Sequence, residues 1–381
     1  MPVGSAPGLA TRIAVVALLL SAAGAGRAAP AGDQHVTIDL YAFSQGDERG
    51  NPLKAEGFEY GAMRVDMKMR MTPAVAFRFN ASVARLRNDD PQRVPASIEN
   101  ARMTAASAEI LTLDSSIGLD IDPKDSPWHI RPSGYYHHQN DFVSSGGDLA
   151  VEREFAGGDT VLGVTYSFRI ASPLLRRWSG RNDGRDISVA NNLLLGWTQV
   201  LSPSWVLALS AQVTRQSGWL GESYNFVALF NDAGAPVKLV DEVLPRKRHR
   251  VQVNGRLRYT PRQGLVLGLD ASGYLDDWSV AQLAVEPSLE VPLSRTIRWR
   301  FWYRLAWQGA SRYFDSRPLA ETRYRTQDPD LGSFLMHSPG TMLTLPFGEE
   351  RIWLTRLGLY GFVRNDGIYG LGADLSLGME W

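Results

Sequence analysis

Residues 297–309 have the sequence Ile-Arg-Trp-Arg-Phe-Trp-Tyr-Arg-Leu-Ala-Trp-Gln-Gly, in which nearly every second residue is apolar or aromatic. The intervening positions include three arginines. A period of two is that of a β-strand, because successive side chains point to opposite faces. Strands of soluble proteins usually have about 5–6 residues. This stretch reaches the length of about 9–11 residues that a tilted strand needs to cross a membrane, and it therefore predicts a membrane-spanning strand.

The same alternation recurs in five other stretches, and in each an apolar face opposes a polar or charged one. These stretches are 63–71, 205–214, 251–259, 265–272 and 282–291. With weaker signals elsewhere, the pattern predicts about sixteen strands at 35–43, 58–71, 74–86, 103–121, 127–140, 147–156, 159–169, 186–201, 204–219, 249–260, 264–276, 279–293, 295–310, 331–345, 350–363 and 367–381. Alternation is poor between residues 87 and 147, so 14 or 18 strands also fit.

The connections between these strands alternate in length. Four are tight, at 72–73, 202–203, 261–263 and Ser294, whereas the longest runs from about residue 220 to 248. Short periplasmic turns and long external loops are typical of outer-membrane barrels. We therefore expect an all-β fold, a transmembrane antiparallel up-and-down β-barrel that forms one domain over residues 29–381.

The N-terminal segment has the organisation of a secretory signal peptide. Arg12 precedes the apolar run 13–20, and small residues follow through 22–26. The run is too short for a membrane-spanning helix. Cleavage after Ala28 or Ala31 fits a small-residue rule. We expect residues 1–28 to be a signal peptide and the mature chain to be integral to the outer membrane of a Gram-negative cell.

The composition excludes several classes of function. The chain has no cysteine, which removes disulfides, thiolate metal sites, iron–sulfur clusters, covalent haem and a lipoprotein anchor. Lys+Arg and Asp+Glu both number 40, so no global field would attract nucleic acid. We interpret the one short basic run, 246–250, as the solvated end of a loop.

The C-terminal residues form a second targeting element. Apolar and aromatic residues alternate with small or polar ones up to the last position, at Tyr369, Leu375, Leu377, Met379 and Trp381. The segment resembles the signal that the barrel-assembly machinery recognises, although that signal usually ends in Phe rather than Trp. The alternative is an ordinary closing strand.

If the apolar faces touch lipid, the ionisable faces line the lumen. The predicted lumen-lining residues are Arg256, Arg258, Asp270, Glu286, Glu290, Arg298, Arg300 and Arg304. One interpretation is a salt-bridge network that only keeps the lumen wettable. The other is a pore that selects solutes by charge and favours anions, because arginines outnumber acids here. A barrel of about 16 strands is wide enough for an aqueous channel unless a loop, such as 224–244, folds inward.

No catalytic, cofactor or metal site is evident, and we expect no enzyme. Adjacent residues on a strand face opposite ways, so His137 and His138 do not share a metal. Met63, Met67 and Met69 belong to an apolar face and are expected to contact lipid. Ser144, Ser145 and His138 could form a hydrolytic site at the rim only if the fold brought them together. The sequence has neither a phosphate-binding loop before a helix nor a spaced His/Glu zinc motif.

Residues 221–313 carry a family resemblance in six segments. They are Gly221-Glu-Ser-Tyr224, Asn231-Asp-Ala-Gly234, Glu242-Val-Leu-Pro245-Arg246, Arg248-His-Arg250, Gly273-Tyr-Leu-Asp-Asp277-Trp278 and the strand from Trp299 to Tyr313. In this order they resemble an uncharacterised bacterial family, known only as a domain of unknown function and regarded as outer-membrane barrels. The resemblance implies architecture and location, and it supplies neither substrate nor catalytic residue.

Three functions follow from these observations. The leading hypothesis is a porin-like channel or transport pore with a charged lumen. The alternative is a structural or scaffold barrel that serves an unidentified periplasmic or surface partner. The third is a surface hydrolase. In each case we expect contacts with outer-membrane lipid and the barrel-assembly machinery, and none with nucleic acid.

Overall fold

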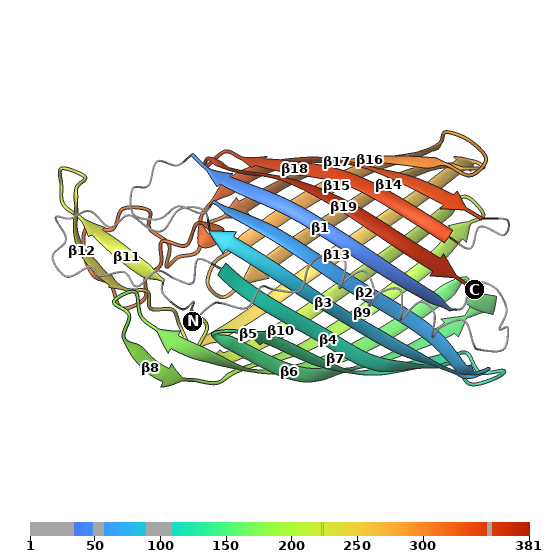
Figure 1. Cartoon of the computed structure of the whole chain (residues 1–381), viewed down its shortest axis with the longest axis horizontal. Helices are drawn as coiled ribbons and strands as arrows, with labels where there is room; N and C mark the ends of the chain where they lie inside the picture. Colours follow the sequence, from blue (N-terminus) through green and yellow to red (C-terminus); the bar gives the residue numbers. More distant parts are fainter. Residues whose placement is uncertain (1–33, 49–56, 89–108, 222, 224, 349–352) are drawn as a thin grey trace, which may run out of the picture.

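The computed structural model describes residues 34–48, 57–88, 109–221, 223, 225–348 and 353–381. In this part of the chain, sixteen long strands form one antiparallel sheet that closes on itself where β1 pairs with β19 (Figure 1). No helix of these residues is long and apolar enough to cross a membrane. The expected signal peptide, 1–28, lies outside the described residues.

Each barrel strand pairs with its neighbours in chain order. The strands are β1 (His35–Asp47), β2 (Phe58–Thr72), β3 (Val75–Asn88), β4 (Glu109–Ile121), β5 (Trp128–Gln139), β6 (Phe142–Phe155), β7 (Thr160–Arg176), β9 (Ser188–Ser202), β10 (Trp205–Gly218), β13 (Lys247–Arg262), β14 (Leu265–Asp276), β15 (Ala281–Pro292), β16 (Arg298–Gly309), β17 (Phe334–Phe347), β18 (Trp353–Arg364) and β19 (Ile368–Glu380).

The predicted architecture and the count of sixteen are confirmed. The predicted start of the sixth strand, at 147, is wrong because β6 begins at Phe142, directly after the tight turn at Asn140 and Asp141. Glycines and serines between 144 and 147 conceal the alternation there. Three short strands lie in the loops and were not predicted: β8 (Asn182–Arg185), β11 (Phe226–Phe230) and β12 (Pro236–Asp241).

The two ends of the barrel differ. One end carries short turns, such as that between β9 and β10 at Ser202–Trp205. The other carries the long connections with β8, β11 and β12, seen at the left of Figure 1. A 3-10 helix, η2 (Pro329–Leu331), lies in the connection from β16 to β17, and another, η1 (Ala156–Gly158), forms the turn from β6 to β7.

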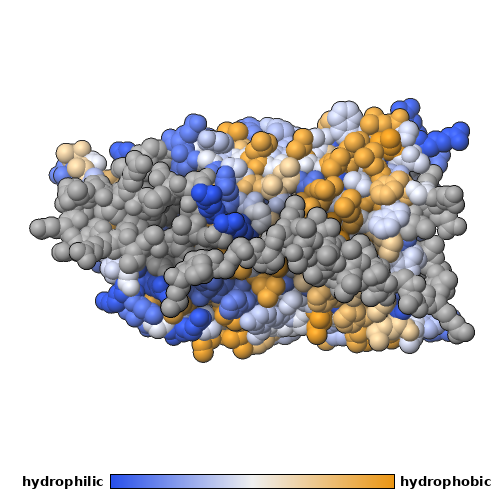
Figure 2. All heavy atoms as spheres, in the orientation of Figure 1, coloured by the Kyte–Doolittle hydropathy of each residue, from blue (hydrophilic) through white to orange (hydrophobic). Residues whose placement is uncertain are grey.

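Apolar side chains cover the outer face of the strands. Leu283 is 62% exposed and Leu359 is 58% exposed, although both lie within paired strands. In Figure 2 hydrophobic residues lie over the strands, and hydrophilic ones gather toward the two ends. Such exposure in water would be unfavourable by about 25 cal/mol per Å² of apolar surface, so this face requires an apolar surrounding.

Aromatic side chains mark the turn-side edge of this apolar surface. Trp128, Trp205 and Trp353 each begin a strand at this end, and each is exposed on the outer face. Phe347 stacks on Trp353 across β17 and β18, with ring centroids 6.1 Å apart. Arg153 lies over the Trp128 ring at 5.1 Å. Amphipathic rings at the rim of an apolar belt are typical of a membrane interface.

Candidate functional site: the lumen and the loop-side mouth

The first three predicted lumenal charges form one cluster. Arg256 and Arg258 on β13 lie on the face opposite the exposed Val251. Arg256 Nε is 2.8 Å from Asp270 Oδ1, and Arg258 Nη2 is 2.7 Å from Asp270 Oδ2. A single carboxylate on β14 therefore accepts from two guanidinium groups.

The other five predicted charges lie on β15 and β16. Glu286 is 4.0 Å from Arg300 and 3.8 Å from Arg304, and Glu290 is 3.3 Å from Arg298. Partly exposed pairs of this kind contribute about 0–1 kcal/mol each, so they keep the wall polar more than they stabilise it. The eight residues together hold five arginines and three carboxylates, which leaves an excess of positive charge.

A second charged cluster lies on β2 to β5 and was missed by the sequence interpretation. Asp120, with a side chain only 6% exposed, is surrounded by Lys68 at 3.2 Å, Arg78 at 3.5 Å and Arg131 at 3.7 Å. Weak alternation between residues 87 and 147 concealed the lumenal face of β4. The charged lining is thus not confined to β13–β16.

A group of uncharged polar side chains lies on the inner face of β9, β10 and part of β13. Thr214 Oγ1 donates to Asn192 Oδ1 at 2.6 Å, and Gln212 Nε2 donates to Thr214 Oγ1 at 3.2 Å. Asn254 Nδ2 donates to Ser210 Oγ at 3.1 Å. Amide and hydroxyl groups here satisfy one another, so this part of the wall is polar without being charged.

A strip of aromatic rings lies on the inner face at the seam of the barrel. Phe43 of β1 is stacked with Tyr360 and Phe362 of β18, at centroid distances of 6.4 and 6.0 Å. The rings extend over β19 because it carries Gly370 and Gly372 there. A Cβ at Gly370 would be 2.5 Å from Phe43, and one at Gly372 would be 2.4 Å from Tyr360.

The connection from β16 to β17 is fastened to the inner wall at the loop side. Gln308 is 1% exposed, and its Nε2 donates to the carbonyl oxygens of Asp330 and Gly332 at 2.8 and 2.7 Å. Arg364 Nη2 donates to Pro329 O at 3.0 Å, and its guanidinium lies 3.8 Å from the centroid of Phe334. These contacts hold η2 against the mouth of the barrel.

A small apolar core continues from this attachment. Trp278 and Leu331 are buried against Val280, and Trp278 Nε1 donates to Lys247 O at 3.0 Å. The predicted strands 264–276 and 279–293 leave residues 277–278 as the link between them, and they also belong to one of the segments that carry the family resemblance. Trp278 anchors the loops at this point.

The hairpin β11–β12 belongs to the same loop-side structure. Phe226, Ala228 and Leu239 form a buried cluster. Ala228 N donates to Gln327 Oε1 at 2.6 Å, and Gln327 Nε2 donates to Ala228 O at 3.2 Å. The loops from β10 to β13 and from β16 to β17 thus hold each other. The loop 224–244, which the sequence interpretation left free to fold inward or not, contains this hairpin, which lies at the loop end of the barrel in Figure 1.

Ion pairs connect the β7–β9 loop with the β10–β13 loop. Arg246 binds Asp186 through two hydrogen bonds of 2.7 and 3.1 Å. Asp183 accepts from Arg177 at 2.6 Å and from Arg181 at 2.7 Å. The hydrogen bonds from these two arginines lower the pKa of Asp183 to about 2. This carboxylate is therefore ionised at any physiological pH.

The basic run 246–250 is only partly the solvated loop end that was expected. Arg246 is exposed, but residues from Lys247 onward belong to β13. Arg248 has a side chain 11% exposed, with its Nε donating to Asp276 Oδ2 at 2.7 Å. Arg250 lines the lumen. The interpretation was wrong for these two residues because strand alternation continues through the run.

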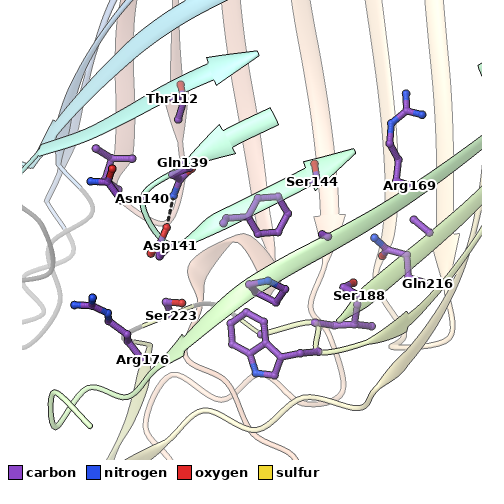
Figure 3. Close-up of a pocket in the computed structure, with 18 of the residues that line it drawn as sticks. Thr112, Gln139, Asn140, Asp141, Ser144, Arg169, Arg176, Ser188, Gln216 and Ser223 are labelled. Carbon is purple, nitrogen blue, oxygen red and sulfur yellow. Dashed lines mark hydrogen bonds between the residues drawn. The ribbon is translucent and has the colours of Figure 1, made fainter. Parts of the chain in front are cut away.

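A cavity of about 1100 Å³ lies inside the barrel below these loops (Figure 3). Its wall comes from β2 to β7, β9, β10 and β13, and residues 219–221 and Ser223 approach from the loop side. In Figure 3, Gln139 and Asp141 lie on one side of the cavity, and Ser188 and Gln216 lie on another. This cavity, formed by wall and loop residues together, is our candidate binding site.

The residues considered for catalysis are distributed over both faces. His138 is exposed and stacks on Tyr136, whereas His137 faces inward with its Nδ1 2.6 Å from Asp114. Ser144 pairs across the strands with His137 rather than with His138. Among the described residues no hydrogen bond joins His137 to Ser144 and no group of side chains could hold a metal. Met69 is exposed on the outer face.

The predicted C-terminal signal lies on β19 and at the chain end. Tyr369 and Leu377 are exposed on the outer face, which Leu375 and Met379 share by alternation. Trp381 N donates to Gln34 O at 3.2 Å, next to the β1–β19 pairing. The segment therefore forms part of the seam that closes the barrel.

Comparison with known protein families gives one match. Residues 175–378 match the model of a family described as "Protein of unknown function (DUF3570)". No curated protein matches the chain.

Among solved structures the chain is similar to a bacterial polysaccharide outer membrane secretin. They share 10% identity and a TM-score of 0.48, with 91% of this chain and 98% of that one covered. It is also similar to CdiB from Acinetobacter baumannii, at 9% identity and a TM-score of 0.47, covering 91% of this chain and 60% of that one. OpdQ from Pseudomonas aeruginosa is similar at 8% identity and a TM-score of 0.44, with 91% of this chain and 97% of that one covered. At such identities solutes and partners do not transfer.

Proposed function

The chain belongs to the DUF3570 family of proteins of unknown function, and we propose that it is a porin-like channel of the Gram-negative outer membrane, with a charged lumen. The family model covers more than half of the chain, and it agrees with the resemblance expected from residues 221–313. The observation that carries the proposal is the division of the strands into an apolar outer face and an ionisable inner face. Strands divided in this way separate lipid from enclosed water.

The outer surface supports the membrane location. Exposed leucines and valines cover the strands, and tryptophans lie at their turn-side ends. Only a closed barrel can present such strands to lipid without unpaired backbone groups, and the β1–β19 pairing supplies the closure. The turns then face the periplasm, and the loop-side mouth faces the exterior.

The inner surface supports passage of small polar solutes. Sixteen strands enclose a lumen wide enough for water. The paired charges of β13–β16 and the cluster around Asp120 keep this lumen wettable. The attached loops narrow the mouth without filling the cavity beneath them. The excess of arginine on β13–β16 favours anions.

The proposal includes partners and excludes catalysis. β19 would be read by the barrel-assembly machinery as an exposed alternating strand. As in the sequence interpretation, we expect no enzymatic activity. A scaffold barrel that holds a periplasmic or surface partner is the alternative when no solute passes.

Conductance in planar lipid bilayers tests the proposal. The purified full-length protein should give stable channels in KCl, with a reversal potential that indicates preference for chloride. Arg300→Glu would place a third acid beside Glu286 and Glu290, and it should shift the permeability ratio toward potassium by at least about twofold.

The matched control is Arg295→Glu, which makes the same charge reversal at an exposed turn between β15 and β16. Arg295→Glu should leave the permeability ratio of potassium to chloride nearly unchanged. Absence of channels at every voltage and salt concentration would reject transport and favour the scaffold barrel. Unchanged selectivity in Arg300→Glu would reject selection by the charged lining.

A further inference from the structure

Two buried polar atoms in the mouth cavity have no hydrogen-bond partner. They are Oε1 of Gln216 on β10 and Nε of Arg250 on β13, and both residues line the cavity. These strands are paired, with Arg250 opposite Thr214, so the two side chains lie near each other on one wall. A buried polar atom left unsatisfied is unfavourable by about 1–3 kcal/mol. This pair indicates a bound molecule that offers an acceptor to Arg250 and a donor to Gln216.

The charge of Arg250 is also uncompensated. Its cross-strand neighbour on β14 is Asp276, but that carboxylate accepts from Arg248 at 2.7 Å, Tyr274 at 2.8 Å and the backbone of Trp278 at 2.9 Å. Arg250 forms no ion pair within the described residues. A guanidinium in a partly desolvated wall is stabilised by an anion, and its planar fork fits a carboxylate.

The other two arginines of the cavity, Arg169 and Arg176, do not alter this conclusion. Arg169 is held by Asp148 at 3.0 Å and lies over the ring of Tyr135, and Arg176 has a partner of its own. Asp141 is the one carboxylate among the residues that line the cavity, and it accepts from Gln139 on the turn between β5 and β6. The lining is therefore net positive, and its one unmatched charge favours a monoanion.

The rest of the wall suits a hydroxylated molecule. Hydroxyl and amide groups line the cavity at several positions: Thr112, Gln139, Asn140, Ser144, Ser188 and Ser223. The ring of Trp219 adds apolar surface to the same lining. Polar groups together with an apolar ring match a polyol, which has hydroxyl groups along a carbon chain.

We propose that this cavity binds a small hydroxylated carboxylate, such as a sugar acid, with its carboxylate on Arg250 and a hydroxyl group donating to Gln216. This inference names the class of solute that the proposed channel carries, and in that respect it rests on the proposed channel function. Binding must remain weak for a solute that passes on, with a dissociation constant on the order of 1 mM.

Isothermal titration of the full-length protein in detergent micelles with gluconate tests the site. Gluconate should bind at least tenfold more tightly than sorbitol, which lacks the charge, and than propionate, which lacks the hydroxyl groups. Arg250→Gln should weaken gluconate binding at least tenfold and should leave the weak binding of sorbitol unchanged. Gln216→Leu should also weaken gluconate.

The matched control is Arg356→Gln, which removes one arginine from the lumenal face of β18 outside the cavity. It should bind gluconate as the wild type does. Heat-modifiable migration checks that each variant is folded, and Gln216→Leu decides the question if Arg250→Gln does not fold. Gluconate binding no tighter than sorbitol, or unaffected by both substitutions, would overturn the proposal.

Bilayer currents separate this inference from the channel itself. Channels that conduct KCl while gluconate fails to bind would reject the site and leave the channel intact. Gluconate binding by a protein that forms no channels would reject transport and keep the site.

Discussion

Arg364 Nη1 lies 2.8 Å from Asp330 Oδ1, so a side chain of the barrel wall holds the loop that covers part of the mouth. The same guanidinium also binds Asp366 at 2.6 Å and lies over Phe334. Asp330 is 78% exposed, and the strength of the attachment therefore depends on the buried arginine rather than on the carboxylate.

We expect Arg364→Met to release this loop. Methionine keeps the apolar contact with Phe334 but removes the donors to Asp330 and Pro329. Charge-assisted hydrogen bonds contribute about 1.5–3 kcal/mol, so trypsin cleavage within residues 310–333 should become about tenfold faster or more. Single-channel conductance should increase as well.

Arg356→Met is the control, because it removes a lumenal arginine from the same strand without touching η2. It should leave loop cleavage at the wild-type rate. Equal protection of the loop in Arg364→Met would mean that Gln308 alone fastens η2, and the role assigned to Arg364 would then be wrong.

The strands could be predicted because a barrel wall contacts lipid on one side and water on the other. Side chains such as Leu283 and Arg300 therefore carry a signal with a period of two. The signal fails between residues 144 and 147, where Ser and Gly residues fit either face. The alternation also cannot specify where a strand ends. Backbone pairing continues beyond the lipid contact wherever two neighbouring strands both extend.

The mouth could not be predicted in the same way. Gln308 continues the alternation of β16 like any lumenal residue, and only the packing of η2 makes it a buried anchor. Arg250 belongs to the basic run 246–250, which composition alone predicts to be solvated. The cavity depends on contacts between loops distant in sequence, and such contacts leave no periodic trace.

Gly218 ends β10 in a conformation that only glycine adopts easily. Its φ is +110°, and a Cβ there would lie 2.0 Å from the carbonyl oxygen of Ile187. Gly218→Ala should lower the free energy of unfolding by about 1–3 kcal/mol, measured from the urea midpoint in lipid vesicles.

Gly196 provides the comparison within the neighbouring strand β9. A Cβ at this position would meet nothing within 4 Å. Gly196→Ala should change the unfolding free energy by no more than about 1 kcal/mol. If both variants unfolded at the same urea concentration, the strain assigned to Gly218 would not exist.

Asp183 accepts a hydrogen bond from Arg177. Arg177 Nη1 is also 3.5 Å from Asp241 at the end of β12, so this arginine connects the β7–β8 hairpin with β12. Asp183 has a pKa of about 2, below the usual value, because Arg181 and Arg177 donate hydrogen bonds to the ionised form. A lowered folded-state pKa stabilises the loops fully above the unfolded value near 3.9. The stabilisation is then lost as the pH falls through about 2.

Carbon-13 NMR of the labelled aspartate carboxylates should therefore show a resonance that titrates near pH 2, and Asp183→Asn should remove it. Arg181→Gln should move the midpoint up toward about 3.9, since one of the two donors is lost. The carboxylate is exposed, so 1 M salt should also raise the midpoint by screening. A wild-type midpoint already near 3.9 would show that the arginines do not hold this carboxylate in solution.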